Sequence, residues 1–241
     1  MQWQDQGIIL SVRRFGETSV ILDVLTARHG RHGGLVRGGR SKRLRAALQP
    51  GNTLDVSWRA RLEDHLGTYG AELVCPRAAI IMDDPAALAA LSSFCALCSL
   101  LSEREAHDNL YGASVLLLDS LAHDAHWPAL MARWELGLLS ALGFGLDLSR
   151  CAANGSTDDL VYVSPRSARA VSRGAGQAFS DRLLTLPAFL TGTTTGYPDE
   201  KDLHDAFVLS GYFLDRHVFG PRGLTPPDAR RRMIEKIVRI K

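Results

Sequence analysis

Five basic side chains lie within the ten residues 36–45, together with Ser41 and the glycine pair Gly38-Gly39; the five are Arg37, Arg40, Lys42, Arg43 and Arg45. Arginine and lysine bind phosphate oxygens, and glycines allow a backbone to approach a ligand closely. Backbone N–H groups around such glycines can also form an anion-binding nest. A solvated surface loop has the same composition. The segment is therefore a candidate polyanion-binding loop, and the elements around it decide between these interpretations.

Charge is distributed unevenly along the 241 residues, although the net charge is only +2. Residues 1–61 contain eleven basic and four acidic side chains, a net charge of +7. Residues 62–150 contain four basic and twelve acidic side chains, a net charge of −8, and residues 151–241 contain thirteen and ten, a net charge of +3. A basic N-terminal segment before an acidic one favours a polyanionic partner near the N-terminus.

Short β-rich segments surround the basic loop, at residues 7–14, 19–26, 33–37, 53–59 and 66–74. Five strands with the long connection after the third predict a small Greek-key barrel of the OB type, which commonly presents a groove to oligonucleotides. We expect a short helix at residues 42–48 within that connection. Trp58 on the fourth strand is a candidate base-stacking platform, although a place in the core is the more frequent role of such a residue.

The remaining chain predicts helices and one irregular segment. Asp84 and Pro85 form a helix start, and the expected helices cover residues 85–105, 109–123, 128–142, 199–219 and 228–240. The uncharged run 85–102 is short for a membrane span and contains serines, so we interpret it as a buried helix. A small hairpin is expected at residues 158–163 and 169–172. No signal peptide is expected, because the first five residues are polar.

The expected fold is α+β and has four parts. They are an OB domain at residues 1–76, a helical domain at 77–146, an irregular zinc-finger-like insertion at 147–198, and C-terminal helices at 199–241 that pack on the helical domain.

Enzyme signatures are absent from the sequence. It contains no phosphate-binding loop, nucleophile elbow or zinc-protease motif. The pair Asp83/Asp84 is explained by a helix cap and the pair Asp158/Asp159 by a turn. Cys95-x-x-Cys98 lacks a second ligand pair, so buried structural thiols are favoured over a metal or redox site. The sequence thus predicts no catalytic residue, no metal and no cofactor, and the sparse cysteines fit a reducing cytosol.

Several short motifs resemble the RecO family of bacterial recombination mediators. They are Gly7-Ile8-Ile9-Leu10, Gly16-Glu17-Thr18-Ser19, Gly30-Arg31, residues 36–41, Leu48-Gln49-Pro50-Gly51, Arg133-Trp134-Glu135-Leu136, Leu139, Leu142-Gly143-Phe144 and Leu148-x-x-Cys151. The resemblance implies a non-catalytic cytoplasmic, nucleoid-associated protein that binds single- and double-stranded DNA and anneals complementary strands. It also implies partnership with RecR, binding to the acidic C-terminal tail of single-strand-binding protein, and indirect action on the RecA recombinase. No membrane partner is expected.

The sequence departs from the family pattern at the insertion. Members with zinc carry four cysteines there, whereas this chain has Cys151 alone, with Asn154 at the next ligand position. Because a zinc site needs a full ligand set, we expect a metal-free lobe.

Two sets of binding residues are expected. The DNA phosphates are assigned to the basic loop and to two arginines before it: Arg13, Arg14, Arg37, Arg40, Lys42, Arg43 and Arg45. Arg133 is the only lysine or arginine between Arg104 and Arg150; we expect it to contact the carboxylate of the single-strand-binding protein tail, a structural ion pair being the alternative. The alternative functions are an OB-type RNA-binding module and, with less support, a metal-dependent nuclease.

Overall fold

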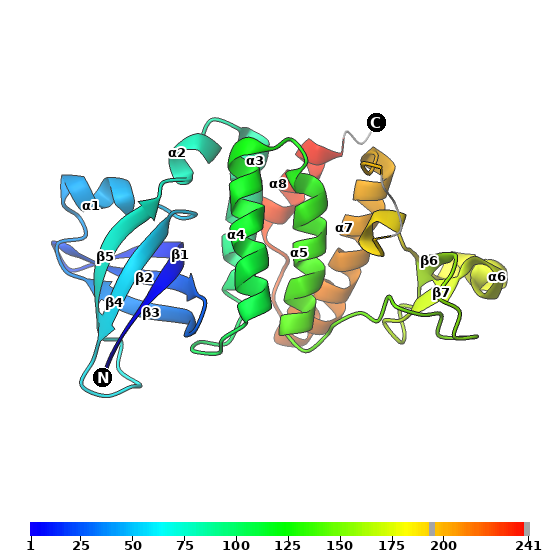
Figure 1. The fold of residues 1–241 in the computed structure, drawn as a ribbon, viewed down its shortest axis with the longest axis horizontal. Helices are drawn as coiled ribbons and strands as arrows, with labels where there is room; N and C mark the ends of the chain where they lie inside the picture. The colour runs from blue at the N-terminus through cyan, green and yellow to red at the C-terminus, as the bar shows by residue number, and fades with distance from the viewer. Residues whose placement is uncertain (193–195, 239–241) are drawn as a thin grey trace. The chain divides into compact units, whose positions relative to one another are not determined.

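The computed structural model describes residues 1–192 and 196–238. Figure 1 shows the order of their elements along the chain. The chain forms two compact units, Met1–Ala125 and His126–Lys241. The expected division at residues 76, 146 and 198 stays a prediction.

The first unit begins with a closed five-stranded barrel, as the sequence predicts. Its strands are β1 (Gln2–Phe15), β2 (Ser19–Thr26), β3 (Gly30–Val36), β4 (Thr53–Arg59) and β5 (Thr68–Cys75). They follow the order β1-β2-β3-β5-β4, and β1 closes the barrel by pairing with both β2 and β4. The pairing of β3 with β5 is parallel, at Leu35 and Thr68, and the other pairings are antiparallel. This is the OB topology.

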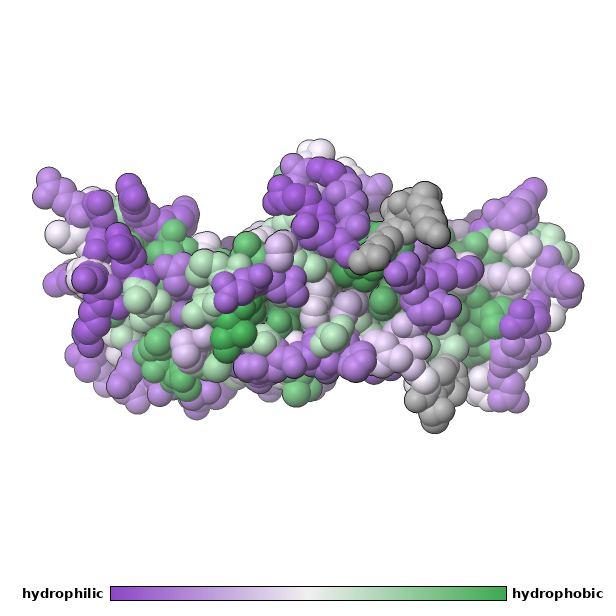
Figure 2. Space-filling model, turned by 90° about the horizontal axis from the view of Figure 1, so that it is seen from above, coloured by the Kyte–Doolittle hydropathy of each residue, from purple (hydrophilic) through white to green (hydrophobic). Residues whose placement is uncertain are grey.

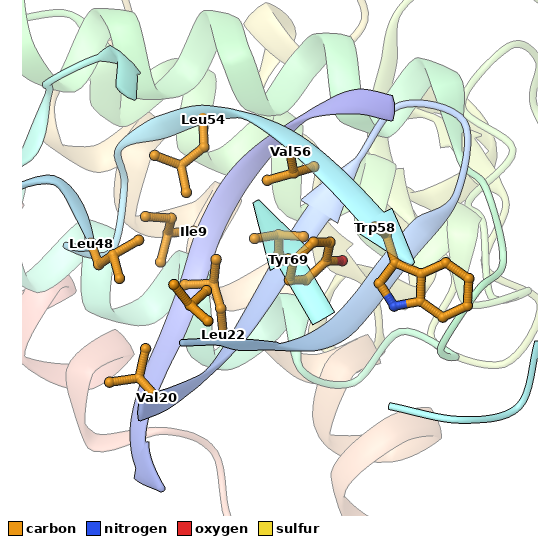
Figure 3. Close-up of a cluster of buried hydrophobic side chains, with 10 residues drawn as sticks. Ile9, Val20, Leu22, Leu48, Leu54, Val56, Trp58 and Tyr69 are labelled. Carbon is orange, nitrogen blue, oxygen red and sulfur yellow. The ribbon is translucent and has the colours of Figure 1, made fainter. Parts of the chain in front are cut away.

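The barrel interior is filled by apolar side chains that alternate along the strands. Ile9, Leu22 and Leu54 are completely buried, and Leu48, which follows the short helix α1 (Lys42–Ala47), packs with them. Figure 3 shows Leu48 toward one end of this cluster and Trp58 toward the other. We call the end of the barrel at Leu48 and the preceding helix the α1 end. We call the opposite end, at Trp58, the Trp58 end.

Three helices complete the first unit: α2 (Ala78–Ile81), α3 (Pro85–Cys98) and α4 (Asp108–His123). The Asp84 carboxylate caps α3 by accepting hydrogen bonds from the N–H groups of Ala86 and Ala87, at 2.7 and 3.3 Å. The predicted extension of this helix to residue 105 is wrong. The backbone of Glu103 and Arg104 instead pairs with Arg31 of β3, with the Arg104 N–H 2.8 Å from the Arg31 carbonyl. The Arg31 guanidinium also donates to the carbonyl of Ser99, directly after the last helical residue. Contacts with a segment distant in sequence thus replace the predicted last turns of the helix.

The second unit combines helices with a small sheet. Its helices are α5 (Trp127–Ala141), α6 (Arg173–Gly176), α7 (Glu200–Leu214) and α8 (Asp228–Ile237). Its strands are β6 (Leu160–Val163), β7 (Ala170–Ser172) and β8 (Leu184–Thr185). The predicted hairpin is present as β6 and β7, whereas β8 was missed because two residues carry no periodicity. A π-helical turn (Asp215–Phe219) continues α7; residues 239 and 240 of the predicted terminal helix lie outside the described residues.

Membrane insertion finds no support among the described helices, since none combines the length and apolar character needed to span a bilayer. The uncharged run after Asp84 instead forms α3, in which Phe94, Leu97 and Cys98 are fully buried. Burial raises the pKa of Cys95 to about 12 and raises that of Cys98 well above its ordinary value. Both thiols are therefore protonated at neutral pH, which agrees with their interpretation as structural residues.

Candidate nucleic-acid interface

The basic loop is a tight turn that joins β3 to α1. Gly38 has a φ of +66°, a conformation that favours glycine. A Cβ on Gly39 would lie 2.5 Å from Cγ2 of Val20, so only glycine allows the turn to pack against the barrel. Ser41 then caps α1, its hydroxyl accepting a hydrogen bond from the Leu44 N–H at 3.4 Å. The glycine pair thus shapes the turn and seats it on the barrel, a structural reason independent of any ligand.

Three predicted DNA-binding arginines line one hollow of about 370 Å³ at the α1 end of the barrel. They are Arg14 from β1, Arg40 from the loop and Arg45 from α1, and Leu48 lies with them in the lining. The Arg40 N–H donates to the Thr18 carbonyl at 3.1 Å, and its guanidinium donates to the Glu17 carbonyl. These bonds hold the loop against the β1–β2 turn. These three arginines come from a strand, a loop and a helix, and the fold of the barrel brings them together.

The other predicted cations differ in position. Arg37, Lys42 and Arg43 are exposed on the loop and on α1. Figure 2 shows mainly hydrophilic residues at the left edge of the view, around the part of the barrel that carries α1. Arg13 is exposed as well, but it alternates with Arg14 along β1 and so projects from the opposite face of the strand. Six of the seven predicted side chains thus belong to the α1 end, and Arg13 is set apart from them.

The interpretation of Trp58 as a stacking platform is wrong. Trp58 is only 1% exposed, and its indole N–H donates to the Leu66 carbonyl at 3.0 Å. Other rings gather beside it at the Trp58 end, namely Trp3, His29, His32 and Tyr69. Sequence reasoning missed this cluster, because its members come from four separate strands and turns.

Arg133 lies on the exposed side of α5, between buried neighbours. Its guanidinium donates to the Phe189 carbonyl at 2.6 Å and lies 5.8 Å from the centroid of the Phe189 ring. Within the described residues it forms no ion pair. The alternative of a structural pair with an acidic helix therefore finds no support in the described part of the chain, and tail recognition stays a prediction.

Arg230, in the basic run 230–232, has a structural role that the sequence did not reveal. It is 9% exposed, and its guanidinium donates to both carboxylate oxygens of Glu135, each at 2.8 Å. Ser210 of α7 donates to the same carboxylate. Arg231 forms ion pairs within α8, with Asp228 and Glu235. Of this run, only Arg232 is left without such a pair among the described residues.

The residues around Cys151 do not form a zinc-binding set. Its Sγ accepts hydrogen bonds from the N–H and the hydroxyl of Ser172, at 3.3 and 3.4 Å. Burial raises the pKa of this thiol, and these hydrogen bonds, together with those from the Asn154 and Ala153 backbone, lower it to a net value of about 7. The Asn154 side-chain oxygen accepts from the Ser156 N–H at 3.1 Å. Within the described residues, no group of three or more His, Cys, Asp or Glu side chains could hold a metal.

Together, a closed OB barrel and a cluster of cations at its α1 end define a class of protein whose members commonly bind oligonucleotides. The family is shown by comparison with known proteins. The models "Recombination protein O N terminal" and "Recombination protein O C terminal" match residues 1–76 and 82–225. The chain therefore belongs to the RecO family.

Curated relatives agree with this assignment along nearly the whole chain. The chain is 51% identical to "DNA repair protein RecO" of Methylobacterium nodulans over 234 residues, which cover 95% of each protein. It is 49% identical to the protein of the same name from Rhodospirillum rubrum, with 99% of this chain and 97% of the relative covered. The corresponding protein of Chelativorans sp. is 48% identical, with 99% and 96% covered.

Proposed function

We propose that this chain is a non-catalytic DNA repair protein that binds single- and double-stranded DNA and anneals complementary strands. In the same proposal it acts with RecR to help load RecA onto DNA coated by single-strand-binding protein, in the cytoplasm at the nucleoid. The observation that carries the proposal is the hollow at the α1 end, where Arg14, Arg40 and Arg45 converge. Family membership supplies the role in repair.

The chemistry of this end suits backbone binding rather than base reading. A guanidinium group can donate two parallel hydrogen bonds to the oxygens of one phosphate. The neighbouring Lys42 and Arg43 extend the positive surface along α1. Phosphate contacts carry no sequence information, so affinity should be similar for all sequences and strongly salt-dependent. A protein that anneals strands needs these two properties, because it must neutralise both backbones and leave the bases free to pair.

The DNA-binding part of the proposal is tested by fluorescence anisotropy with a labelled single strand. If about four phosphates are neutralised, log affinity falls with log salt at a slope of about −3. Replacing Arg40, Lys42 and Arg43 with Ala should flatten that slope by about 2 and weaken binding to every sequence. The control removes three exposed arginines of the second unit, Arg166, Arg173 and Arg182. An unchanged slope in the first variant moves the DNA site away from the α1 end.

The partner tail is proposed to dock beside Arg133. A peptide with an apolar C-terminal residue needs a cation for its carboxylate, and the guanidinium of Arg133, beside the ring of buried Phe189, provides one. Arg133→Glu should abolish binding of the tail peptide while the annealing of bare DNA is retained. Arg150→Glu, an exposed arginine in the same unit, is the control. Retained peptide affinity in Arg133→Glu rejects the assignment.

The RNA-binding alternative rests on the phosphate chemistry of the α1 end, because the backbones of DNA and RNA both present phosphates to these cations. Competition between matched DNA and RNA single strands decides between them. Preference for RNA favours that alternative. Cleavage of DNA in magnesium by the purified protein would instead support the nuclease alternative.

A further inference from the structure

The Trp58 end of the barrel contains a three-ring stack that leads from the core to the surface. Trp58 and Trp3 lie 5.7 Å apart between ring centroids at an interplanar angle of 20°, and Trp3 and His29 lie 4.0 Å apart at 7°. Trp58 is buried, Trp3 is half-buried, and the His29 side chain is 30% exposed. The stack therefore ends in a flat, partly exposed ring. A further planar ring can extend such a stack.

A hollow of about 390 Å³ adjoins the stack. Its lining includes Trp3, His29 and His32 together with two arginines, Arg28 and Arg104. Their charge is opposed within the lining by the single carboxylate of Glu63. Aromatic surfaces flanked by guanidinium groups are the usual composition of sites for single-stranded nucleic acid, where bases stack and phosphates bind the cations.

Both arginines are held in place by the barrel. Arg28 donates to the Gln4 carbonyl at 2.6 Å and lies 3.5 Å from a carboxylate oxygen of Asp5. That carboxylate also accepts from the Arg28 N–H at 2.9 Å and lies 3.2 Å from Nδ1 of His29. The anchoring of the Arg28 backbone and the His29 ring to one carboxylate fixes the last ring of the stack beside a cation.

Arg104 is held differently, in a backbone conformation that few residues other than glycine adopt. Its φ is +65°, and its N–H donates to the Arg31 carbonyl at 2.8 Å. Its guanidinium donates to the His65 carbonyl at 3.2 Å. The next residue, Glu105, lies close to Gly30. A Cβ on Gly30 would lie only 2.0 Å from the Glu105 carbonyl oxygen. Close backbone packing thus holds an arginine at the hollow in a conformation that costs energy.

We propose that the Trp58 end is a second binding site for single-stranded DNA, in which one unpaired base packs against the Trp3–His29 rings and its flanking phosphates contact Arg28 and Arg104. This inference rests on the proposed function. The site is distinct from the α1 end, because the two hollows share no lining residue. Trp3 and Arg14 are eleven residues apart on β1, which is about 36 Å along a fully extended strand. A single strand that spans both sites falls within the roughly 4–16 nucleotides that one OB barrel covers.

The test uses the full-length protein, a fluorescein-labelled twelve-residue oligothymidylate and an abasic strand of equal length and charge. Arg28→Ala with Arg104→Gly removes both cations, and glycine keeps the backbone conformation of residue 104 without strain. Loss of two phosphate contacts should reduce the slope of log affinity against log salt by about 1.4. This change corresponds to roughly 25-fold weaker binding at 0.1 M salt. The control, Arg166→Ala with Arg182→Ala, removes two exposed charges from the second unit and should keep wild-type affinity. Wild-type protein should prefer the oligothymidylate to the abasic strand by about fivefold or more, the contribution of one stacked base.

Each outcome bears on the proposal. Equal affinity of the double variant and its control, or no preference for the strand with bases, overturns it. If the double variant has lost its thermal unfolding transition, Arg104→Gly alone should bind about fivefold more weakly, and wild-type affinity in that variant overturns the proposal. A last outcome is that thymidine monophosphate binds to the wild-type protein, loses affinity in the double variant and does not compete with the labelled strand. This outcome identifies a free-nucleotide site and overturns the assignment to DNA. Failure of the proposed function is distinguishable, because it appears as unchanged binding in the variant that lacks Arg40, Lys42 and Arg43.

Discussion

The pH dependence of stability should be governed by two groups of the first unit that oppose each other, the buried His32 and the half-buried Asp23. His32 is 3% exposed, and its Nδ1 lies 3.0 Å from the Tyr69 hydroxyl. Burial, with the positive charge of Arg104, lowers the pKa of His32 to about 4. Burial also raises the pKa of Asp23 to about 6, and the attraction of Arg31 opposes that rise. The first group resists protonation in the folded state, whereas the second favours it.

The pKa shifts of His32 and Asp23 change the free energy of unfolding in opposite directions as the pH falls. The folded state binds a proton at His32 more weakly than the unfolded state does, so stability is lost as the pH falls from about 6.5 to about 4. Between pH 7 and 4.5 this loss amounts to about 2 kcal/mol. The folded state binds a proton at Asp23 more tightly, so stability rises as the pH falls through about 6 toward 3.8, by about 2 kcal/mol over the same interval. The two contributions nearly cancel in the wild-type protein.

Asp23→Asn should therefore expose the slope of His32. Urea unfolding monitored by tryptophan fluorescence at pH 7 and 4.5 should show the variant losing about 2 kcal/mol more stability on acidification than the wild-type protein. The variant should also be more stable than wild type at pH 7, because residue 23 then carries no half-buried charge. Adding His32→Asn should remove most of the extra slope. Parallel pH profiles for the wild-type protein and Asp23→Asn would refute the reasoning.

Further predictions concern packing, ion pairing and metal content. Arg230→Met should destabilise the second unit by about 3–5 kcal/mol, whereas Arg230→Met with Glu135→Leu should recover most of that loss in urea unfolding, since no buried charge is left unpaired; equal losses in both variants would contradict this. Gly39→Ala should cost about 1–3 kcal/mol because its Cβ meets Val20, and Gly38→Ala, with open space but a positive φ, about 1 kcal/mol; a larger loss for Gly38→Ala would reverse the explanation of the turn. Elemental analysis of purified protein should find no stoichiometric zinc, and stoichiometric zinc would overturn the interpretation of the Cys151 lobe.

Local sequence patterns predicted much of the fold correctly. Alternating apolar residues marked the barrel strands, and Asp84-Pro85 marked the start of α3, because these signals act within one or two turns of chain. The charge-rich loop between β3 and α1 was also recognisable from composition. The hollow at the α1 end could be predicted only in part, since Arg14 reaches it through the β1–β2 hairpin whereas Arg13 projects from the other face of β1.

The remaining features depend on contacts between distant residues. The end of α3 is set by pairing with Arg31, some seventy residues earlier, so helix propensity alone extended the helix too far. The burial of Arg230 is not visible in the basic run 230–232, because its partner Glu135 lies on another helix. The ring stack at the Trp58 end joins residues from the start of β1, the β2–β3 turn and β4. No spacing rule connects such positions before the barrel is closed.

The central claim, that the cations at the α1 end hold DNA for annealing, is tested most directly by the rate of strand annealing. Two complementary labelled oligonucleotides are mixed with the wild-type protein, with the variant lacking Arg40, Lys42 and Arg43, and with the variant lacking Arg166, Arg173 and Arg182. Each reaction is run on bare DNA and on DNA coated by single-strand-binding protein. Without any nucleotide cofactor, the wild-type protein and the second variant should anneal both substrates, and the first variant should lose this activity on both. Annealing by the first variant at the wild-type rate, or a requirement for ATP, would contradict the account.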